Sequence, residues 1–88
     1  MQSRKFTIVN RLGLHARAAA QLVQTANQFS SEVTLFKEDV EVNGKSIMGI
    51  LLLAAPKGTE ISVAIDGPDE EQAMIVLADL IEDGFGED

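Results

Sequence analysis

His15 and Arg17 are the two residues of this chain whose types and spacing most clearly suggest chemistry. A histidine side chain can carry a phosphoryl group covalently, because one ring nitrogen is unprotonated at neutral pH and acts as a nucleophile. A guanidinium two residues later would supply a fork of hydrogen-bond donors for phosphate oxygens. Gly13, just before the pair, allows a tight turn of the backbone. The segment therefore suggests phosphate chemistry.

The same segment departs from the usual start of a helix. Apolar spacing predicts a helix from Ala16, and Ser, Thr, Asp or Asn would normally cap its first N–H groups. Leu14 and His15 stand at the position of the cap instead, and Arg17 adds a positive charge to a dipole end that is already positive. Both choices cost stability in an empty protein, and both are explained if an anion binds the free N–H groups. We therefore predict a phosphate site at this helix start.

Two other interpretations of His15 stay open from the residues alone. A lone histidine is often an exposed or structurally satisfied residue, and its spacing from Arg17 does not exclude that. A metal site is less favoured, because the chain has no second histidine and no cysteine to share an ion with His15. We expect no metal and no cofactor.

Hydrophobic periodicity predicts the elements that position this segment. Alternation predicts four strands with these apolar residues: Phe6 and Ile8 within residues 5–9; Val33 and Leu35; Val40 and Val42; and Ile61, Val63 and Ile65. Helical spacing predicts three helices with these apolar stripes: Ala19, Leu22, Val23 and Ala26; Ile47, Ile50, Leu51 and Ala54; and Ala73, Val76, Leu77 and Leu80. We expect Pro56 and Gly58 to close the second helix and Gly84 to end the third.

The predicted order is βαββαβα, within one domain over residues 1–88. Helices packed on one face of a four-stranded sheet make a two-layer α+β sandwich. A chain of 88 residues has no room for a second hydrophobic core.

Composition excludes several classes of partner. Seven basic and fourteen acidic residues give a formal net charge of −7, which repels nucleic acid and anionic membranes. The longest apolar stretch, residues 47–55, is far too short to span a bilayer, and the start of the chain lacks the apolar segment of a secretory signal. The absence of cysteine excludes disulfides and fits a reducing compartment. We expect a soluble, cytoplasmic protein without nucleic-acid or membrane partners.

Charge is distributed unevenly along the chain. The first 17 residues hold four basic residues and no acid: Arg4, Lys5, Arg11 and Arg17. Residues 66–88 hold nine acids and no base. We expect the acidic ending to be solvated surface, at Glu82, Asp83, Glu87 and Asp88.

The segment NRLGLHAR, residues 10–17, resembles the active-site segment of HPr, the histidine-containing phosphocarrier family of the bacterial sugar phosphotransferase system. Chain length and element order are similar to that family as well. The segment GKSIMG, residues 44–49, resembles the regulatory serine region of HPr from Gram-positive bacteria. The ending GFGED, residues 84–88, is similar to the nitrogen-branch relative NPr.

The resemblance implies an open-faced β-sandwich with three helices on a four-stranded antiparallel sheet. It implies that His15 accepts a phosphoryl group on Nδ1 from phosphorylated enzyme I and passes it to an EIIA domain, as a covalent carrier rather than an enzyme. Arg17 and the backbone amides of Ala16, Arg17 and Ala18 would hold the phosphoryl oxygens. An alternative is a regulatory module of the same fold, whose phosphorylation state signals to its partners. We expect a monomer.

Ser46 has two compatible interpretations, both of which stay open. It stands directly before the second apolar stripe, where a helix N-cap belongs, and the resemblance also makes it a site for a serine kinase and its phosphorylase. The resemblance places the surface that meets enzyme I at Leu14, Ile47 and Met48. The family usually has proline at the position of Ala18, so the first helical turn here is less preorganised.

Overall fold

The protein, described over residues 1–87 by a computed structural model, is a four-stranded sheet with helices packed on one face. Its elements in chain order are β1 (Gln2–Thr7), α1 (Ala16–Ala26), β2 (Glu32–Lys37), β3 (Val40–Asn43), α2 (Ile47–Leu52), β4 (Glu60–Asp66), α3 (Glu70–Glu82) and the 3-10 turn η1 (Gly84–Gly86). The strands run in the order β1-β4-β2-β3, with every neighbouring pair antiparallel. The predicted α+β class and the βαββαβα order are confirmed, and η1 is added at the end.

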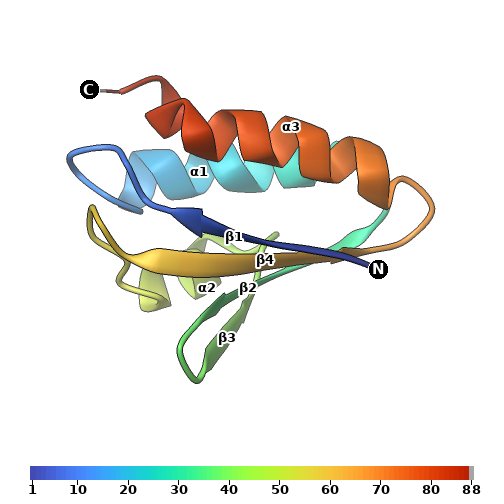
Figure 1. The fold of residues 1–88 in the computed structure, drawn as a ribbon, viewed down its shortest axis with the longest axis horizontal. Coiled ribbons are helices and arrows are strands. Elements are labelled where there is room, and N and C mark those ends of the chain that lie inside the picture. The colour runs from blue at the N-terminus through green and yellow to red at the C-terminus, as the bar shows by residue number, and fades with distance from the viewer. Residues whose placement is uncertain (88) are drawn as a thin grey trace.

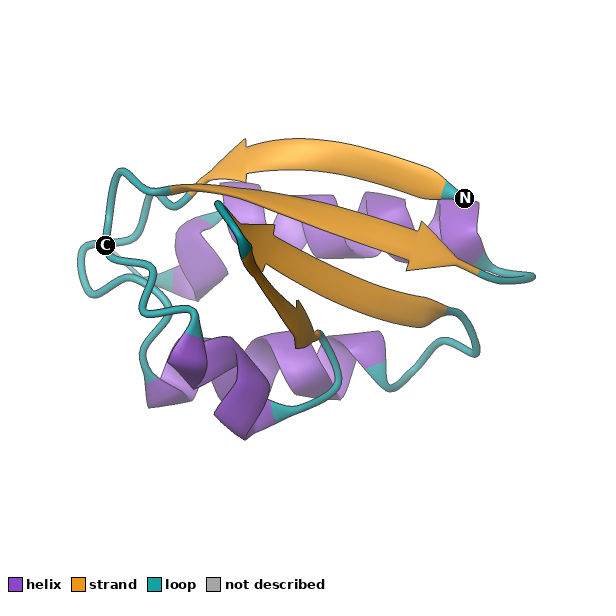
Figure 2. Cartoon of the chain, turned by 90° about the horizontal axis from the view of Figure 1, so that it is seen from below, coloured by secondary structure: helices purple, strands orange, loops and turns teal. Residues whose placement is uncertain are grey.

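The helices form a second layer over the sheet. Figure 1 shows α1 and α3 side by side across the sheet, and α2 contacts both α1 and β3. Figure 2 shows the opposite face of the sheet turned to the viewer, with the long helices behind it. Within residues 1–87, no helix combines the length and the apolar character that crossing a membrane takes.

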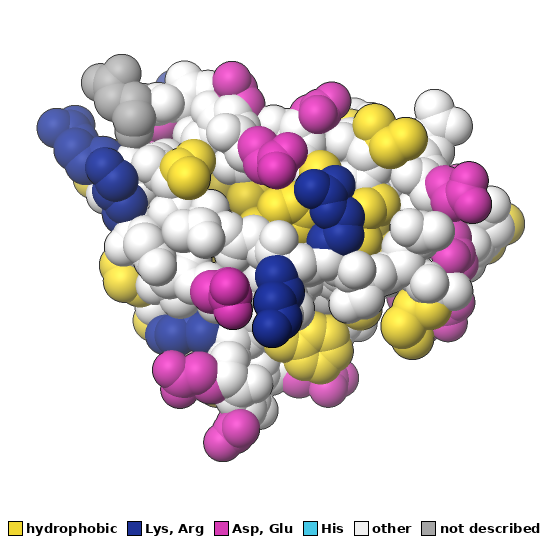
Figure 3. Space-filling model, in the orientation of Figure 1, with side chains coloured by type: hydrophobic (Ala, Val, Ile, Leu, Met, Phe, Trp, Pro, Cys, Tyr) yellow, Lys and Arg dark blue, Asp and Glu magenta, His cyan; other side chains and the backbone are white. Residues whose placement is uncertain are grey.

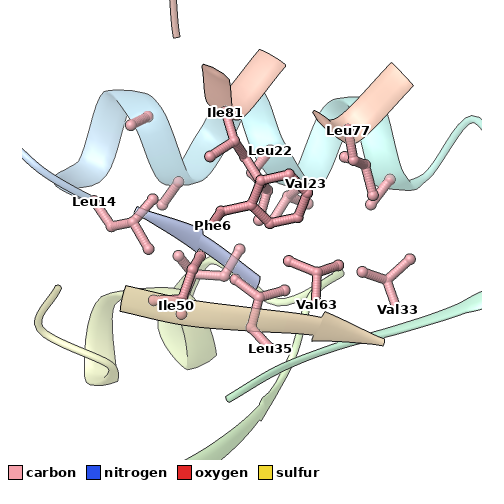
Figure 4. Packing of buried hydrophobic residues seen from close by; sticks show 14 of the residues in the cluster. Phe6, Leu14, Leu22, Val23, Val33, Leu35, Ile50, Val63, Leu77 and Ile81 are labelled. Carbon is pink, nitrogen blue, oxygen red and sulfur yellow. The ribbon is translucent and has the colours of Figure 1, made fainter. Parts of the chain in front are cut away.

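Period-two burial in the strands confirms the predicted inward-facing residues of β2 and β4. Val33 and Leu35 are buried, and the buried residues of β4 alternate with exposed or half-buried neighbours. Figure 4 shows Val33, Leu35 and Val63 pointing from the sheet toward Leu22 and Val23 of α1, which also belong to the core. The predicted stripe of α1 is buried throughout, so this helix is fixed on the sheet directly after His15.

The inner face of α3 differs from the predicted stripe. The residues that it buries are Ala73, Met74, Leu77, Ala78 and Ile81, whereas Val76 and Leu80 are only half-buried. The pattern was ambiguous because residues 73–78 are all apolar, so apolar side chains lie on more than one face of the helix. Packing against the sheet selects one of these faces and leaves Ile75 exposed.

The second helix is shorter than its apolar pattern predicts. It ends at Leu52, and Ala54 has a φ of +50°, so the prediction that Ala54 continues the helix is wrong. Lys37 satisfies carbonyls at this ending, because its Nζ donates to those of Leu53 and Ala54 at 3.0 and 3.1 Å. A cation at the C-terminal end of a helix satisfies free carbonyls and complements the dipole.

Candidate functional site

A tight loop between β1 and α1 places His15 at the start of α1. Gly13 has a φ of +69°, and a Cβ there would lie 2.6 Å from the carbonyl oxygen of Ala55, so this position requires glycine. The backbone N–H of Leu14 donates to that same carbonyl at 2.9 Å. The loop is thus fastened to the segment after α2, and His15 follows as the N-cap residue of α1.

Both ring nitrogens of His15 have a defined neighbour. Nδ1 lies 3.3 Å from the backbone nitrogen of Arg17, whose N–H points to it, and Nε2 lies 2.7 Å from Oε2 of Glu87. A backbone N–H can only donate, and an ionised carboxylate can only accept. The two neighbours therefore agree on one tautomer, in which Nε2 carries the proton and Nδ1 has the free lone pair.

The helix start is capped by His15 itself, which corrects the expectation of an uncapped end. Its Nδ1 takes the place of the usual Ser or Asp oxygen, but 3.3 Å is a long hydrogen bond. Within residues 1–87, no acceptor is found for the backbone N–H of Ala16 or of Ala18. The first turn of α1 thus leaves the amides of Ala16 and Ala18 without an internal acceptor, and only that of Arg17 has one. Ala16 and Arg17 are exposed, whereas Ala18 is buried.

Two arginines lie beside this helix start. Arg11 and Arg17 line a hollow of about 280 Å³ together with Leu12, Gly86 and Glu87, which we call the basic hollow. Figure 3 shows Lys and Arg side chains at the end of the molecule where the loop from β1 to α1 lies. Arg17 was predicted at the site. Arg11 was missed as a site residue, although its place in the basic N-terminal cluster was a signal.

The other two residues of that basic cluster have partners elsewhere. Arg4 lies 3.7 Å from a carboxylate oxygen of Glu82, and Lys5 lies 4.0 Å from one of Glu60. Both pairs are well exposed, so they contribute little to stability. Of the four basic residues in this cluster, Arg11 and Arg17 are therefore the ones that line the basic hollow.

Glu87 corrects the expectation that the acidic ending is solvated surface. Its side chain is only 15 % exposed. Oε2 is hydrogen-bonded to Nε2 of His15, and Oε1 accepts a hydrogen bond from Nδ2 of Asn10 at 2.9 Å. The pKa of Glu87 is lowered, first by the hydrogen bond from Asn10 and then by the hydrogen bond and charge of His15 and by Arg17, against the opposing effect of burial. Glu82 and Asp83 are exposed as expected, and Asp88 lies outside the described residues.

The turn η1 carries the chain back from α3 to the site. Gly84, Phe85 and Gly86 all have positive φ, at +68°, +58° and +74°. Phe85 is 2 % exposed, so burial of its ring offsets the cost of a left-handed backbone at a non-glycine residue. The end of α3 at Gly84 is as predicted.

A sequence model of a known family, described as the phosphorylation site of the PTS HPr component, matches residues 2–83 of this chain. The chain belongs to the HPr family. It is 55 % identical to the phosphocarrier protein HPr of Neisseria meningitidis serogroup A, over 99 % of this chain and 98 % of that protein.

Solved HPr structures have the same fold. HPr-C-His from Thermoanaerobacter tengcongensis matches with a TM-score of 0.96 and 46 % identity, over 100 % of this chain and 99 % of that one. An HPr dimer from the same organism matches with a TM-score of 0.79 and 47 % identity, over 99 % of this chain and 100 % of that one. Both comparisons confirm the resemblance seen in the sequence.

The expected docking surface of this HPr-family chain needs one correction. Leu14 is only 5 % exposed, because its side chain joins the core, so it forms the floor of a shallow hollow beside His15 rather than open surface. Met48 is 70 % exposed and Ile47 is exposed as well, as a docking role requires. Leu12 and Leu52 are also exposed, which the sequence did not indicate because isolated leucines have no distinguishing pattern.

Ser46 is the N-cap of α2, as its position in the sequence predicts. Its Oγ accepts a hydrogen bond from the backbone N–H of Gly49 at 3.1 Å.

No cluster of three or more potential metal ligands among His, Cys, Asp and Glu occurs in residues 1–87.

Proposed function

We propose that this HPr-family chain accepts a phosphoryl group on Nδ1 of His15 from phosphorylated enzyme I and passes it to EIIA domains. The observation that carries the proposal is the orientation of the imidazole ring. Its Nε2 is bonded to Glu87, and its Nδ1 lies at the start of α1. The lone pair of Nδ1 therefore lies where N–H groups and the helix dipole stabilise an anion.

Arg17 and the amides of Ala16, Arg17 and Ala18 are proposed to hold the phosphoryl oxygens. In the free protein the N–H of Arg17 donates to Nδ1. Once Nδ1 forms its bond to phosphorus, that lone pair is used, and the N–H becomes available to a phosphoryl oxygen. The guanidinium of Arg17 lines the basic hollow and would add charge-assisted donors, which stabilise charge most where the protein holds them in place.

Donor and acceptor are proposed to dock in turn on exposed apolar residues of α2 and of the loop before His15. These residues are Ile47, Met48 and Leu52 in α2 and Leu12 in the loop. Leu12 and Leu14 line the hollow beside His15. Both partners must bring a reacting atom to the same Nδ1, so they share one surface and exclude each other. The chain then acts as a covalent carrier in the cytoplasm, monomeric between encounters, and serves sugar transport without turnover of its own.

Ser46 is proposed as a regulatory phosphorylation site for a serine kinase and a phosphorylase. A phosphate adds a charge of about −1.5 to −2, which a helix N-terminus tolerates, so the fold should survive. Ile47 and Met48 follow directly and are exposed, so the new charge would penalise a partner that brings acids to this surface. Ser46→Asp should therefore slow phosphorylation of His15 and leave the circular dichroism spectrum unchanged. If Ser46→Asp accepts phosphate from enzyme I as fast as the parent does, and no such kinase labels the parent, then Ser46 acts only as a helix cap.

A regulatory role is the second candidate, favoured by the ending GFGED and its similarity to NPr. The chemistry at His15 would be the same, but the phosphorylation state would signal to partners and little phosphoryl flux would pass. The two roles differ in which EIIA domains remove the phosphate. Transfer to a regulatory EIIA alone supports the second candidate, and transfer to a sugar-permease EIIA supports the first.

Incubation with phosphoenolpyruvate and enzyme I tests the proposal. Mass measurement should find one acid-labile phosphoryl group on the parent and none on His15→Ala. A parent that takes up no phosphate would contradict the proposal, as would an equal adduct on His15→Ala.

A further inference from the structure

Glu87 contacts His15 although the two residues are 72 positions apart and Glu87 lies beyond residues 2–83, which match the family. We infer that Glu87 is a positioning residue for phosphoryl transfer. Its carboxylate holds the Nε2–H of His15, keeps the Nδ1 lone pair free and balances the positive charge that the ring gains when Nδ1 binds phosphorus. This inference rests on the proposed function, because it adds a residue to the same transfer step.

The contact is built from both ends of the chain. Asn10 is 1 % exposed, and its Nδ2 donates to Oε1 of Glu87 at 2.9 Å and to the carbonyl of Gly13 at 2.8 Å. The buried ring of Phe85 and the backbone bond from the N–H of Glu87 to the carbonyl of Gly84, at 3.0 Å, fix the turn that brings the carboxylate back. The carboxylate is therefore held by the loop that carries His15 as well as by its own turn.

Each carboxylate oxygen of Glu87 accepts a hydrogen bond from a different donor. Oε1 accepts from Asn10 and Oε2 accepts from His15, so both oxygen positions of the side chain require a hydrogen-bond acceptor. The lowered pKa of Glu87 keeps the group ionised at neutral pH. A second-sphere carboxylate of this kind fixes the tautomer and orientation of a histidine ring and stabilises its cationic form.

The charge balance of the transfer step explains what the carboxylate would contribute. The Nδ1 lone pair attacks phosphorus, and the bond from phosphorus to the donor breaks with its electron pair leaving on the donor. The ring now has phosphorus on Nδ1 and a proton on Nε2, and it carries the positive charge. In the second transfer the acceptor attacks phosphorus, the Nδ1–P electron pair returns to Nδ1, and neutral imidazole leaves with the Nε2 proton still in place. Glu87 faces the charged ring in both steps.

The substitution Glu87→Gln is a sharp test because of this two-donor arrangement. A glutamine has one acceptor oxygen and one NH₂ group, so it satisfies either Asn10 or His15 and presents a donor to the other. Glu87→Ala removes both contacts. Glu41→Gln is the matched control, since it removes the same charge from an exposed position on β3, the strand at the far edge of the sheet.

Three measurements separate positioning from docking and from a purely structural role. The first is the rate of phosphorylation by phosphoramidate, a small donor that reacts with histidine without docking. The second is kcat and KM for uptake from enzyme I and phosphoenolpyruvate, and the third is the Nε2–H signal of unphosphorylated His15 in NMR spectra. We expect both Glu87 variants to slow the phosphoramidate reaction and kcat by roughly tenfold to a hundredfold, the order expected for one charge-assisted hydrogen bond. The Nε2–H signal should exchange slowly in the parent and in Glu41→Gln, and be lost to solvent exchange in Glu87→Ala.

If the parent is phosphorylated normally and both Glu87 variants react with phosphoramidate and enzyme I as fast as the parent, this inference is overturned and the proposed function stands. A change in KM alone would also overturn it, because Glu87 would then act in docking. A parent that reacts with phosphoramidate but not with enzyme I would contradict the proposed function. In that case a slowed phosphoramidate reaction in both variants would still support the positioning role of Glu87.

Discussion

The side-chain amide of Asn10 ties the loop that carries His15 to the end of the chain, by donating to Oε1 of Glu87 at 2.9 Å. The same Nδ2 donates to the carbonyl of Gly13 at 2.8 Å, so one buried side chain fixes two segments that meet at the site. The position of the imidazole therefore depends on residues from both ends of the sequence.

Asn10→Ala should destabilise the protein by about 1–3 kcal/mol, because it leaves buried acceptors without their donor. Urea unfolding would measure the loss. Asn43→Ala is the control, since Asn43 is exposed and its Oδ1 accepts from the backbone N–H of Lys45 at 2.9 Å. That variant should lose clearly less stability, and equal losses would contradict a special role of Asn10.

Ala54→Gly should stabilise the protein by about 1 kcal/mol. Ala54 is exposed and has a φ of +50°, a left-handed conformation that costs a non-glycine residue roughly 1–2 kcal/mol. Part of that gain is offset because glycine has more freedom in the unfolded chain. Ala20→Gly within α1 should destabilise by about 1 kcal/mol instead. The midpoint temperatures of thermal unfolding of the two variants should shift in opposite directions from that of the parent. A lower midpoint for Ala54→Gly would contradict backbone strain at Ala54.

Stability should fall as the pH drops through the lowered pKa of Asp69. Its carboxylate accepts from the hydroxyl and N–H of Ser31 and from the N–H of Ser30, and the Ser31 hydroxyl bond is the largest cause that lowers the pKa below the ordinary 3.8. When the pKa of a carboxyl group is lower in the folded protein than in the unfolded chain, its contribution to stability is complete at pH values above the unfolded pKa. That contribution is lost as the pH falls through the folded pKa. The free energy of unfolding, measured with urea between pH 2 and 6, should fall less steeply toward low pH for Asp69→Asn than for the parent. Asp79→Asn, which removes an exposed carboxylate within α3, is the matched control. A slope for Asp69→Asn equal to that of the parent would contradict the role of Asp69.

Arg17→Ala should slow phosphoryl uptake and leave stability the same or slightly higher. The guanidinium stands at the positive end of α1, where a basic residue is unfavourable, so its removal does not cost stability. Uptake from enzyme I should slow by about tenfold to a hundredfold, because a donor aimed at the developing charge is lost. Arg4→Ala, on β1 and paired with Glu82, should transfer at the parent rate. Equal rates for Arg17→Ala and the parent would rule out this role.

Local pattern was enough to predict most of the fold. Alternating apolar residues mark β2 and β4, and the stripe of α1 is unambiguous because glutamines occupy its polar side. The inner face of α3 was less certain, since residues 73–78 are all apolar and only packing on the sheet selects among them. Pro56 indicated that the second helix ends, but the left-handed backbone at Ala54 had no signal of its own in the sequence. The lysine whose Nζ donates to the carbonyls there comes from β2.

The site divides in the same way. His15, Arg17 and Ser46 occupy sequence positions whose spacing already suggests a role. The contact between His15 and Glu87 joins residues 72 apart, so no local pattern predicts it. A phenylalanine between two glycines directly after α3 was the available signal, because it indicates a turn with a buried anchor rather than a free acidic ending.

The most direct test is to identify the nitrogen that carries the phosphoryl group. The protein, labelled with ¹⁵N, would be phosphorylated by enzyme I and phosphoenolpyruvate, and the phosphorus coupling of each His15 ring nitrogen measured by NMR. We predict that the coupling appears on Nδ1, while Nε2 keeps its proton and its contact with Glu87. Phosphorus on Nε2, or on any other residue, would contradict it.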